Sequence, residues 1–248
     1  MPTSGSLSAP FLRRIALLPE KADRRVFPFD TFPRLLDDDF SLDFDRPVTF
    51  FVGENGTGKS TVLEAIATLC GFHAGGGGEW HQLHQTADET VSALASALRS
   101  SWLPKVSRGF FFRSDTFTDV ARYLDDAGDS ALHGGRRLHE QSHGESFLAL
   151  FKGRFDTDQR CIYLMDEPEN ALSPMRQLGF LRLLRDWEAS GNAQMIVATH
   201  SPLLMAAPDS VVISFDRSPP APVPFDEIES VALYRAFLQA PARYLRHL

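Results

Sequence analysis

The segment from Gly53 to Ser60 reads GENGTGKS and satisfies the P-loop pattern G-x-x-x-x-G-K-[S/T] at every fixed position. In such a loop, consecutive backbone N–H groups converge on phosphate oxygens, and the positive end of a helix dipole lies behind them. The flanking sequence fits this context. An apolar, β-rich run at 47–52 predicts a strand, and the pattern at 61–69, ended by Gly71, predicts a helix. The motif therefore predicts a nucleoside triphosphate site.

Each position of the loop has a predicted task. The glycines permit backbone angles and a close approach that a Cβ would forbid. Lys59 is expected to reach the β and γ phosphates, and the Ser60 hydroxyl is expected to contact Mg²⁺. The residues predicted to bind the nucleotide from this segment are Gly53, Glu54, Asn55, Gly56, Thr57, Gly58, Lys59, Ser60 and Thr61.

A second motif follows an apolar run at 161–165. This run ends in Asp166 and Glu167, as expected for a strand that is buried on both faces and delivers charge at its carboxyl end. In the Walker B interpretation, Asp166 holds Mg²⁺, and Glu167 orients or deprotonates the water that attacks the γ-phosphate. The alternative is that the two acids only end the strand. The upstream P-loop favours the Walker B interpretation.

A third strand brings a histidine to the same edge. Ser173-Pro174 predicts the start of a helix that continues to Gly191, and the apolar run at 195–199 then predicts a strand followed by His200. A single histidine is more often structural than catalytic. Because parallel strands end at one edge of a sheet, we expect His200 to contact the γ-phosphate.

The remaining pattern predicts one α/β domain over 1–248, with a mainly parallel sheet, flanking helices and a small antiparallel β flank at the N-terminus. The expected parts are a disordered start (1–10), the β flank and P-loop strand (11–52, with strands at 11–18 and 41–45), a helical signature region (72–145) and a helical tail (216–248). Within these parts, 75–78 is expected to be a flexible loop, 88–102 a helix, 110–112 a strand, 114–126 a helix and 146–151 a helix.

Composition limits the partners and the cellular compartment that are expected for this chain. The formal charge of −7 disfavours a nonspecific nucleic-acid coat, and no apolar run approaches the length of a membrane helix. The two cysteines, Cys70 and Cys161, are too few for a disulfide framework and are expected to be buried thiols. These features predict a soluble, cytoplasmic protein without direct membrane insertion.

Residues His139 to His143 match H-E-x-x-H, in which His139 and His143 would bind zinc beside Glu140, as in a metallopeptidase. Glycines close to both ends disfavour the continuous helix that this site needs. The same segment can instead place Ser142 and Gly144 at a helix N-terminus, which suits anion binding and shares a ligand with the P-loop. We favour the second interpretation.

In their order, these motifs resemble those of the ABC-type ATPases, and more narrowly the small stand-alone ATPases akin to the SMC and recombination-repair class. The resemblance covers residues 45–215. Its further elements are a signature-like segment at Ser142, His143, Gly144 and Glu145 and a D-loop-like segment at 169–173. The resemblance implies that Ser142 and Gly144 of one subunit complete the ATP site of another, in a head-to-tail dimer, and Glu145 is also expected to bind the nucleotide. The departures are His143 where the family usually has glycine, Ser173 where it often has aspartate, and no assignable Q-loop glutamine.

The sequence therefore predicts Mg²⁺-dependent ATP binding and hydrolysis by an ATP-sandwiched homodimer, with Glu167, His200 and Lys59 as catalytic residues and Ser60 and Asp166 as metal ligands. The resemblance implies a protein or DNA partner, with DNA repair, DNA maintenance or defence favoured over transport. A zinc metallopeptidase and a nucleotide-dependent regulator that does not hydrolyse ATP are the alternatives.

Overall fold

The computed structural model describes residues 7–32, 35, 40–73, 75–78, 89–118, 122, 125, 143–154 and 157–246. The strands are β1 (Leu12–Leu17), β2 (Ser41–Asp43), β3 (Val48–Val52), β4 (Gly77–Gly78), β5 (Leu98–Trp102), β6 (Gly109–Arg113), β7 (Cys161–Asp166), β8 (Ala193–Ala198), β9 (Val211–Ser214) and β10 (Ala221–Pro222). The α-helices are α1 (Lys59–Cys70), α2 (Glu89–Ala97), α4 (His143–Arg154), α5 (Pro174–Ser190), α6 (Pro202–Met205), α7 (Glu229–Gln239) and α8 (Pro241–Leu245). Short 3₁₀ turns are η1 (Pro19–Lys21), η5 (Pro168–Ala171) and η6 (Phe225–Glu227).

The main sheet has the strand order β10-β9-β3-β8-β7-β6-β4. Strands β9, β3, β8, β7 and β6 pair in parallel, and the edge strands β10 and β4 pair antiparallel. Every residue of β3, β7 and β8 is buried, which explains their nearly continuous apolar sequences. The predicted fold class, a P-loop ATPase-like α/β fold with a mainly parallel sheet, is confirmed. The carboxyl ends of β3, β7 and β8 meet at one edge.

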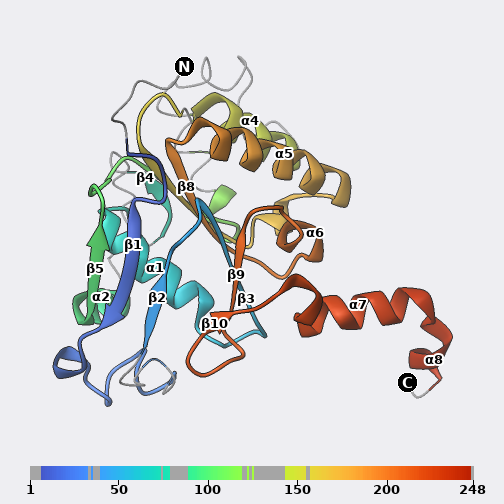
Figure 1. The fold of residues 1–248 in the computed structure, drawn as a ribbon, viewed down its shortest axis with the longest axis horizontal. Coiled ribbons are helices and arrows are strands. Elements are labelled where there is room, and N and C mark those ends of the chain that lie inside the picture. The colour runs from blue at the N-terminus through green and yellow to red at the C-terminus, as the bar shows by residue number, and fades with distance from the viewer. Residues whose placement is uncertain are drawn as a thin grey trace.

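Helices cover both faces of this sheet (Figure 1). Buried residues of α1 and α2 form one core with the N-terminal strands. Buried residues of α4, α5 and α6 form a second core. In the second core, the ring of Phe112 on β6 lies 4.9 Å from that of Phe147 and 5.5 Å from that of Phe151, both on α4. The P-loop helix and the signature-like helix therefore pack into separate layers.

A three-stranded antiparallel sheet, β2-β1-β5, forms the predicted N-terminal flank. Gln194 on β8 connects it to the main sheet: its Oε1 accepts the N–H groups of Phe11 and Leu12 at 2.8 Å each, and its Nε2 donates to the Leu12 carbonyl at 3.0 Å. All three polar contacts are buried. Gln194 thereby satisfies backbone groups that would otherwise be orphaned at the junction.

The structure corrects the helix predicted at 88–102. The helix ends at Ala97, and Leu98 to Trp102 form β5, which pairs with β1 from Leu17↔Leu98 to Leu12↔Trp102. The spacing of Leu94, Leu98 and Trp102 fits a helix, but Leu98 and Trp102 also fit the two-residue alternation of a strand. Pairing with the distant strand β1 decides between the two patterns.

Three smaller predictions are also affected. The 75–78 segment is not wholly a loop, because Gly77 and Gly78 pair with Phe111 and Phe110 on the edge of the main sheet. Within the start predicted to be disordered, Ala9 is buried and its N–H donates to the Gly191 carbonyl at 2.9 Å, so this residue is fixed by the end of α5. Six of the thirteen residues of the helix predicted at 114–126 lie outside the described residues.

Other expectations agree with the structure. Cys70 and Cys161 are free and buried, and burial raises the pKa of the Cys70 thiol. Helices α1 and α5 end at Gly71 and Gly191, whose φ angles of 85° and 71° are left-handed. Among the residues that the structure describes, no helix combines the length and apolarity needed to span a membrane.

Candidate nucleotide-binding site

The P-loop connects the end of β3 to the start of α1. Gly58 is the N-cap of α1 and has a left-handed φ of 93°, and Gly56 has a φ of 77° with open space where a Cβ would lie. These angles allow the loop to turn sharply before the helix begins. The first N–H groups of an α-helix have no partner within the helix, so the start of α1 can offer donors to a phosphate.

Lys59 is held inside this turn. Its side chain is buried, and its Nζ donates to the carbonyl oxygens of Gly53 and Glu54 at 2.8 Å each. Burial lowers the pKa of Lys59, and the nearby carboxylates, of which Glu167 and Asp216 act most strongly, oppose that shift. The ammonium group is thus positioned at the loop before any ligand arrives.

Ser60 and Asp166 form the candidate metal pair. The Ser60 hydroxyl donates to Asp166 Oδ1 at 3.0 Å, which joins the first turn of α1 to the end of β7. Burial raises the pKa of Asp166 to about 7, and the hydrogen bond from Ser60 opposes the shift. A buried carboxylate beside a hydroxyl offers the hard oxygen ligands that Mg²⁺ prefers, so these two residues fit that ion.

Glu167 follows Asp166 in a left-handed conformation, with φ 49° and ψ 52°. A non-glycine residue in this region stores about 1–3 kcal/mol of strain and occurs most often at functional sites. The conformation is fixed by the Glu167 N–H, which donates to the Ala198 carbonyl at 2.9 Å. The carboxylate accepts a hydrogen bond from Asn170 Nδ2 at 2.8 Å. The turn thus holds Glu167 next to Ser60 and Asp166 but outside the pair that could bind Mg²⁺.

His200 lies next to Glu167, as the strand order predicts. Its Nε2 is 3.7 Å from Glu167 Oε1. The ring is partly exposed, yet Nε2 itself is covered and has no hydrogen-bond partner among the residues that the structure describes. A covered imidazole nitrogen without a partner needs a polar ligand, which a phosphate oxygen can supply.

Glu169 is a site residue whose role the sequence analysis missed. Its Oε1 accepts the backbone N–H of His200 at 2.6 Å, which ties the D-loop-like turn to the end of β8. Burial raises the pKa of Glu169, and the hydrogen bond from His200 opposes this shift. The sequence placed Glu169 in a D-loop-like segment, but only the folded turn shows that its carboxylate orients His200.

Arg113 is a second residue that the sequence analysis did not place in the site. It ends β6 directly beside Asp166 on β7. Its guanidinium group forms a bidentate pair with Asp115 at 3.0 and 2.8 Å and also contacts Glu64 on α1. Burial opposes the charged form, but these carboxylates keep the pKa of Arg113 above its usual value. Arg113 supplies positive charge next to the buried Asp166.

Asp216 is the third such residue. It follows β9, the parallel neighbour of β3, and its Oδ1 accepts the Glu54 N–H at 2.8 Å. A Cβ on Gly53 would lie 3.0 Å from the same oxygen, and the Gly53 φ of 141° is one that other residues rarely adopt, so glycine suits this close approach. The apolar strand before Asp216 was the available signal, because the end of a parallel strand beside β3 must reach the P-loop edge.

Asp216 leads to a first prediction. Changing Asp216 to Asn keeps an acceptor for the Glu54 N–H and removes a negative charge from beside the loop. We expect ATP to bind roughly two- to fivefold more tightly, in line with about 0.5–1 kcal/mol for an exposed charge interaction. Calorimetry with MgATP would measure this, with Asp209→Asn as the control for loss of an exposed charge elsewhere. Weaker binding of ATP by Asp216→Asn would contradict the prediction.

Of the signature-like residues, the structure describes only the start of α4, and it places this helix in the core layer opposite α1. Ser142 lies outside the described residues, while Gly144 and Glu145 belong to the first turn of α4. Glu145 Oε1 lies 3.4 Å from Arg176 on α5. Since α4 packs in the core layer opposite α1, the structure keeps this helix apart from its own P-loop helix.

The zinc alternative is not tested. His139 and Glu140 lie outside the described residues, and His143 is the first residue of α4. Within the ranges that the structure describes, no group of three or more His, Cys, Asp or Glu side chains is arranged to hold a metal ion.

Comparison with known protein families confirms the resemblance to P-loop ATPases. One AAA domain family matches residues 29–90, which include the P-loop. A second AAA domain family, described as a candidate AbiEii toxin of a type IV toxin–antitoxin (TA) system, matches residues 134–206, which include Asp166, Glu167 and His200. The two matches and the fold support nucleotide binding and hydrolysis in general. No curated protein matches the chain significantly.

Several solved structures are similar in outline. The SMC head domain from Thermotoga maritima is 18% identical and covers 87% of this chain and 99% of its own, with a TM-score of 0.44. CbiO1 from Clostridium perfringens, part of the ABC transporter complex cbiONQ, is 14% identical, covers 97% and 100%, and has a TM-score of 0.46. An Smc head bound to the C-winged helix domain of ScpA is 14% identical, covers 86% of this chain and 98% of its own, and has a TM-score of 0.48.

Proposed function

We propose that this chain is a Mg²⁺-dependent ATPase. The observation that supports this most strongly is the convergence of five side chains at one edge of the main sheet. Lys59 lies inside the P-loop, Ser60 Oγ bonds to Asp166, and Glu167 lies beside the covered nitrogen of His200. Phosphoryl transfer needs a phosphate cradle, a metal pair and a group that serves the attacking water, and these residues fit those tasks.

In the proposed mechanism, Lys59 and the loop amides stabilise negative charge that develops on the phosphate oxygens. Ser60 and Asp166 would hold Mg²⁺, which when bound neutralises phosphate charge. Glu167 orients the attacking water and accepts its proton. His200 donates from its ring to a γ-phosphate oxygen, and Glu169 fixes the backbone of His200 for this contact.

We also propose that ATP is bound between two subunits. Gly144 and Glu145 lie on α4, whose core layer is separate from that of α1, so they are available to a neighbouring subunit rather than to their own P-loop. In this arrangement, ATP binding closes the dimer and hydrolysis releases it, which would drive a change in a protein or DNA partner in the cytoplasm. DNA maintenance or defence is favoured over transport.

The test is phosphate release from the purified chain with ATP, followed before and after chelation. We expect turnover that stops with EDTA and returns with Mg²⁺, and light scattering that shows an increase from monomer to dimer mass when ATP is added to a dilute sample. Stoichiometric zinc in the purified protein, with a peptidase activity that a chelator removes and that Zn²⁺ but not Mg²⁺ restores, would instead favour the metallopeptidase alternative. ATP binding without any phosphate release would favour the regulator that does not hydrolyse ATP.

A further inference from the structure

The turn that follows His200 is attached to α5 through a buried polar contact. The Ser201 hydroxyl donates to Gln177 Oε1 at 2.5 Å, and Gln177 Nε2 donates to the Leu172 carbonyl at 3.2 Å. Both polar side chains are buried, with Gln177 9% and Ser201 7% exposed. One amide on α5 therefore joins the turn after His200 to the D-loop-like segment at 169–173.

The orientation of the Gln177 amide follows from its partners. The Leu172 carbonyl can only accept a hydrogen bond, so it must face the NH₂ group of the amide. The amide oxygen is then left to accept from Ser201, whose own oxygen accepts the Leu204 N–H at 3.4 Å as the N-cap of α6. A glutamate at position 177 could accept from Ser201 but could not donate to Leu172. The site therefore needs the donor and the acceptor that one amide combines.

A second hydrogen bond joins the same two segments. Glu169 Oε1 accepts the His200 N–H at 2.6 Å. The D-loop-like segment is thus tied to two successive residues, directly at the His200 backbone and through Gln177 at the Ser201 side chain. Attachments at neighbouring residues restrict the backbone between them more than either does alone, and such supporting contacts hold a functional side chain in its productive geometry.

The His200 ring depends on this support. Its Nε2 is covered, lies 3.7 Å from Glu167 Oε1, and has no hydrogen-bond partner within the ranges that the structure describes. The position of the ring is therefore set by the backbone of His200 and by the turn behind it. A displacement of about 1 Å in a group that meets a reacting phosphate can reduce the rate by about 10²-fold.

We propose that Gln177 is a positioning residue for ATP hydrolysis, which holds the Ser201 turn so that the His200 ring meets the γ-phosphate. The inference rests on the proposed ATPase function and adds to it a residue outside the P-loop, the metal pair and the strand ends. The hydrogen bonds of Gln177 go to Leu172, Ser173 and Ser201. Gln177 therefore acts through His200 and not on the nucleotide itself.

The experiment compares phosphate release and MgATP calorimetry in Gln177→Met, where methionine keeps the length of the side chain and removes both hydrogen bonds of the amide. We expect kcat to fall about tenfold while the MgATP dissociation constant changes by less than about twofold, because the P-loop is untouched. Ser201→Ala breaks the same link from its other end and should give the same result, so the link is tested even if Gln177→Met folds poorly.

A double-mutant cycle with His200→Ala distinguishes positioning from a general structural role. When the imidazole is already absent, Gln177→Met should lower kcat by less than about twofold further, because the two residues act in series. Single-turnover assays with radiolabelled ATP and excess protein keep slow hydrolysis measurable in these variants.

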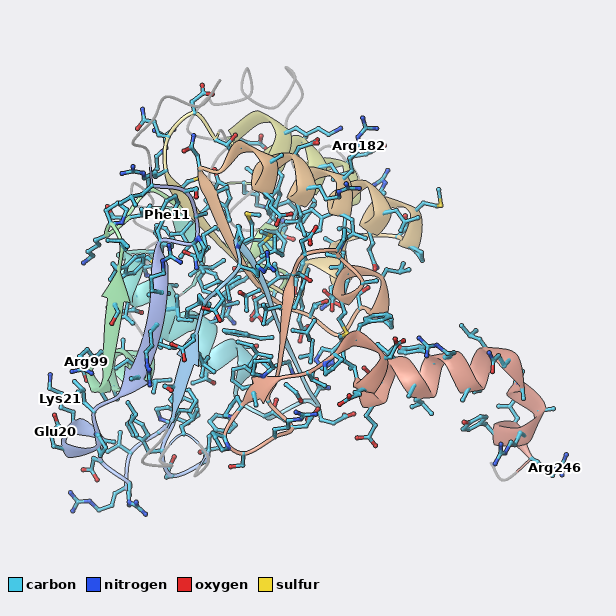
Figure 2. The ribbon with its side chains drawn as sticks, viewed as in Figure 1. Phe11, Glu20, Lys21, Arg99, Arg182 and Arg246 are labelled. Carbon is cyan, nitrogen blue, oxygen red and sulfur yellow. The ribbon has the colours of Figure 1, made fainter. Side chains whose placement is uncertain are left out.

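Gln194→Met is the matched control. The Gln194 side chain is fully buried and its amide also makes hydrogen bonds, but these go to Phe11 and Leu12. Figure 2 shows Phe11 on the side of the molecule that holds β1, apart from the position of α6 in Figure 1. Gln194→Met should lower the melting temperature at least as much as Gln177→Met and keep kcat within about twofold of the wild type, when assayed below both melting temperatures.

Three results would overturn the proposal: an unchanged kcat in folded Gln177→Met and Ser201→Ala, an equal fall of kcat with and without the His200 imidazole, or a fall of the same size in Gln194→Met. Failure of the proposed function is a different outcome, because it would show as a wild-type chain that releases no phosphate.

Discussion

Alanine in place of Lys59 should weaken MgATP binding by at least about tenfold and reduce phosphate release by a similar or larger factor. The Nζ group is held by two loop carbonyls and faces the carboxylates of Asp166 and Glu167 from a buried position. A hydrogen bond from a charged donor contributes about 1.5–3 kcal/mol, and each 1.4 kcal/mol is a factor of ten in affinity. Without the Lys59 ammonium group, the negative charge of the acidic residues in the site is no longer balanced and repels the phosphates.

Calorimetry and phosphate release on the same preparations would measure the effect. Lys105→Ala is the matched control, because it removes an exposed lysine that lies outside the site and should change neither quantity. Lys59→Arg should rescue little, since the planar, branched guanidinium group cannot occupy the position of a single ammonium between the carbonyls of Gly53 and Glu54. Normal hydrolysis by Lys59→Ala would show that the P-loop is not the nucleotide site.

The main sheet could be predicted from local sequence because its central strands are buried on both faces. Nearly continuous apolar runs at β3, β7 and β8, each leading into a segment of the candidate site, indicate parallel strands that end at one edge. The helix boundaries at Gly71 and Gly191 were equally visible, since a left-handed glycine ends each helix. Where a sequence pattern fits only one kind of local structure, the sequence alone is enough to predict that structure.

Strand β5 shows where local pattern fails. The sequence from Leu98 to Trp102 is compatible with helix and strand, and the hydrogen bonds that select the strand come from β1, which is far away in the sequence. The same limit applies to the edge strand at Gly77 and Gly78, whose backbone pairs with β6 although glycine has a low intrinsic preference for strands. Non-local pairing decided both segments.

The residues of the candidate site also fall into two groups, those that the local sequence reveals and those that only the fold reveals. Lys59, Ser60, Asp166, Glu167 and His200 were visible because motif spacing and strand order place them at one edge. Their supporting contacts were not visible, because the bonds from Glu169 to His200 and from Asp216 to the P-loop join separate strand ends. A sequence pattern identifies the groups that meet a ligand more readily than the groups that orient them.

Changing Glu167 to Gln should reduce ATP hydrolysis by about 10²- to 10⁴-fold, the usual contribution of a general base, while ATP affinity changes little. Glutamine has nearly the same shape, and its side-chain oxygen can still accept the hydrogen bond that Asn170 donates to Glu167 at 2.8 Å. The left-handed turn is also retained, because it is fixed by the Glu167 N–H bond to the Ala198 carbonyl. The substitution therefore removes the proton acceptor and leaves the structure around it.

A chain that binds ATP without hydrolysing it should accumulate in the closed, ATP-bound dimer. Light scattering of Glu167→Gln with MgATP should show a dimer that persists, whereas the wild-type dimer should decay as ATP is consumed. Glu188→Gln, a change on α5 outside the site, is the matched control and should hydrolyse ATP like the wild type. Unchanged hydrolysis by Glu167→Gln would show that another group serves the water, and a persistent monomer with ATP would count against the sandwich of two subunits.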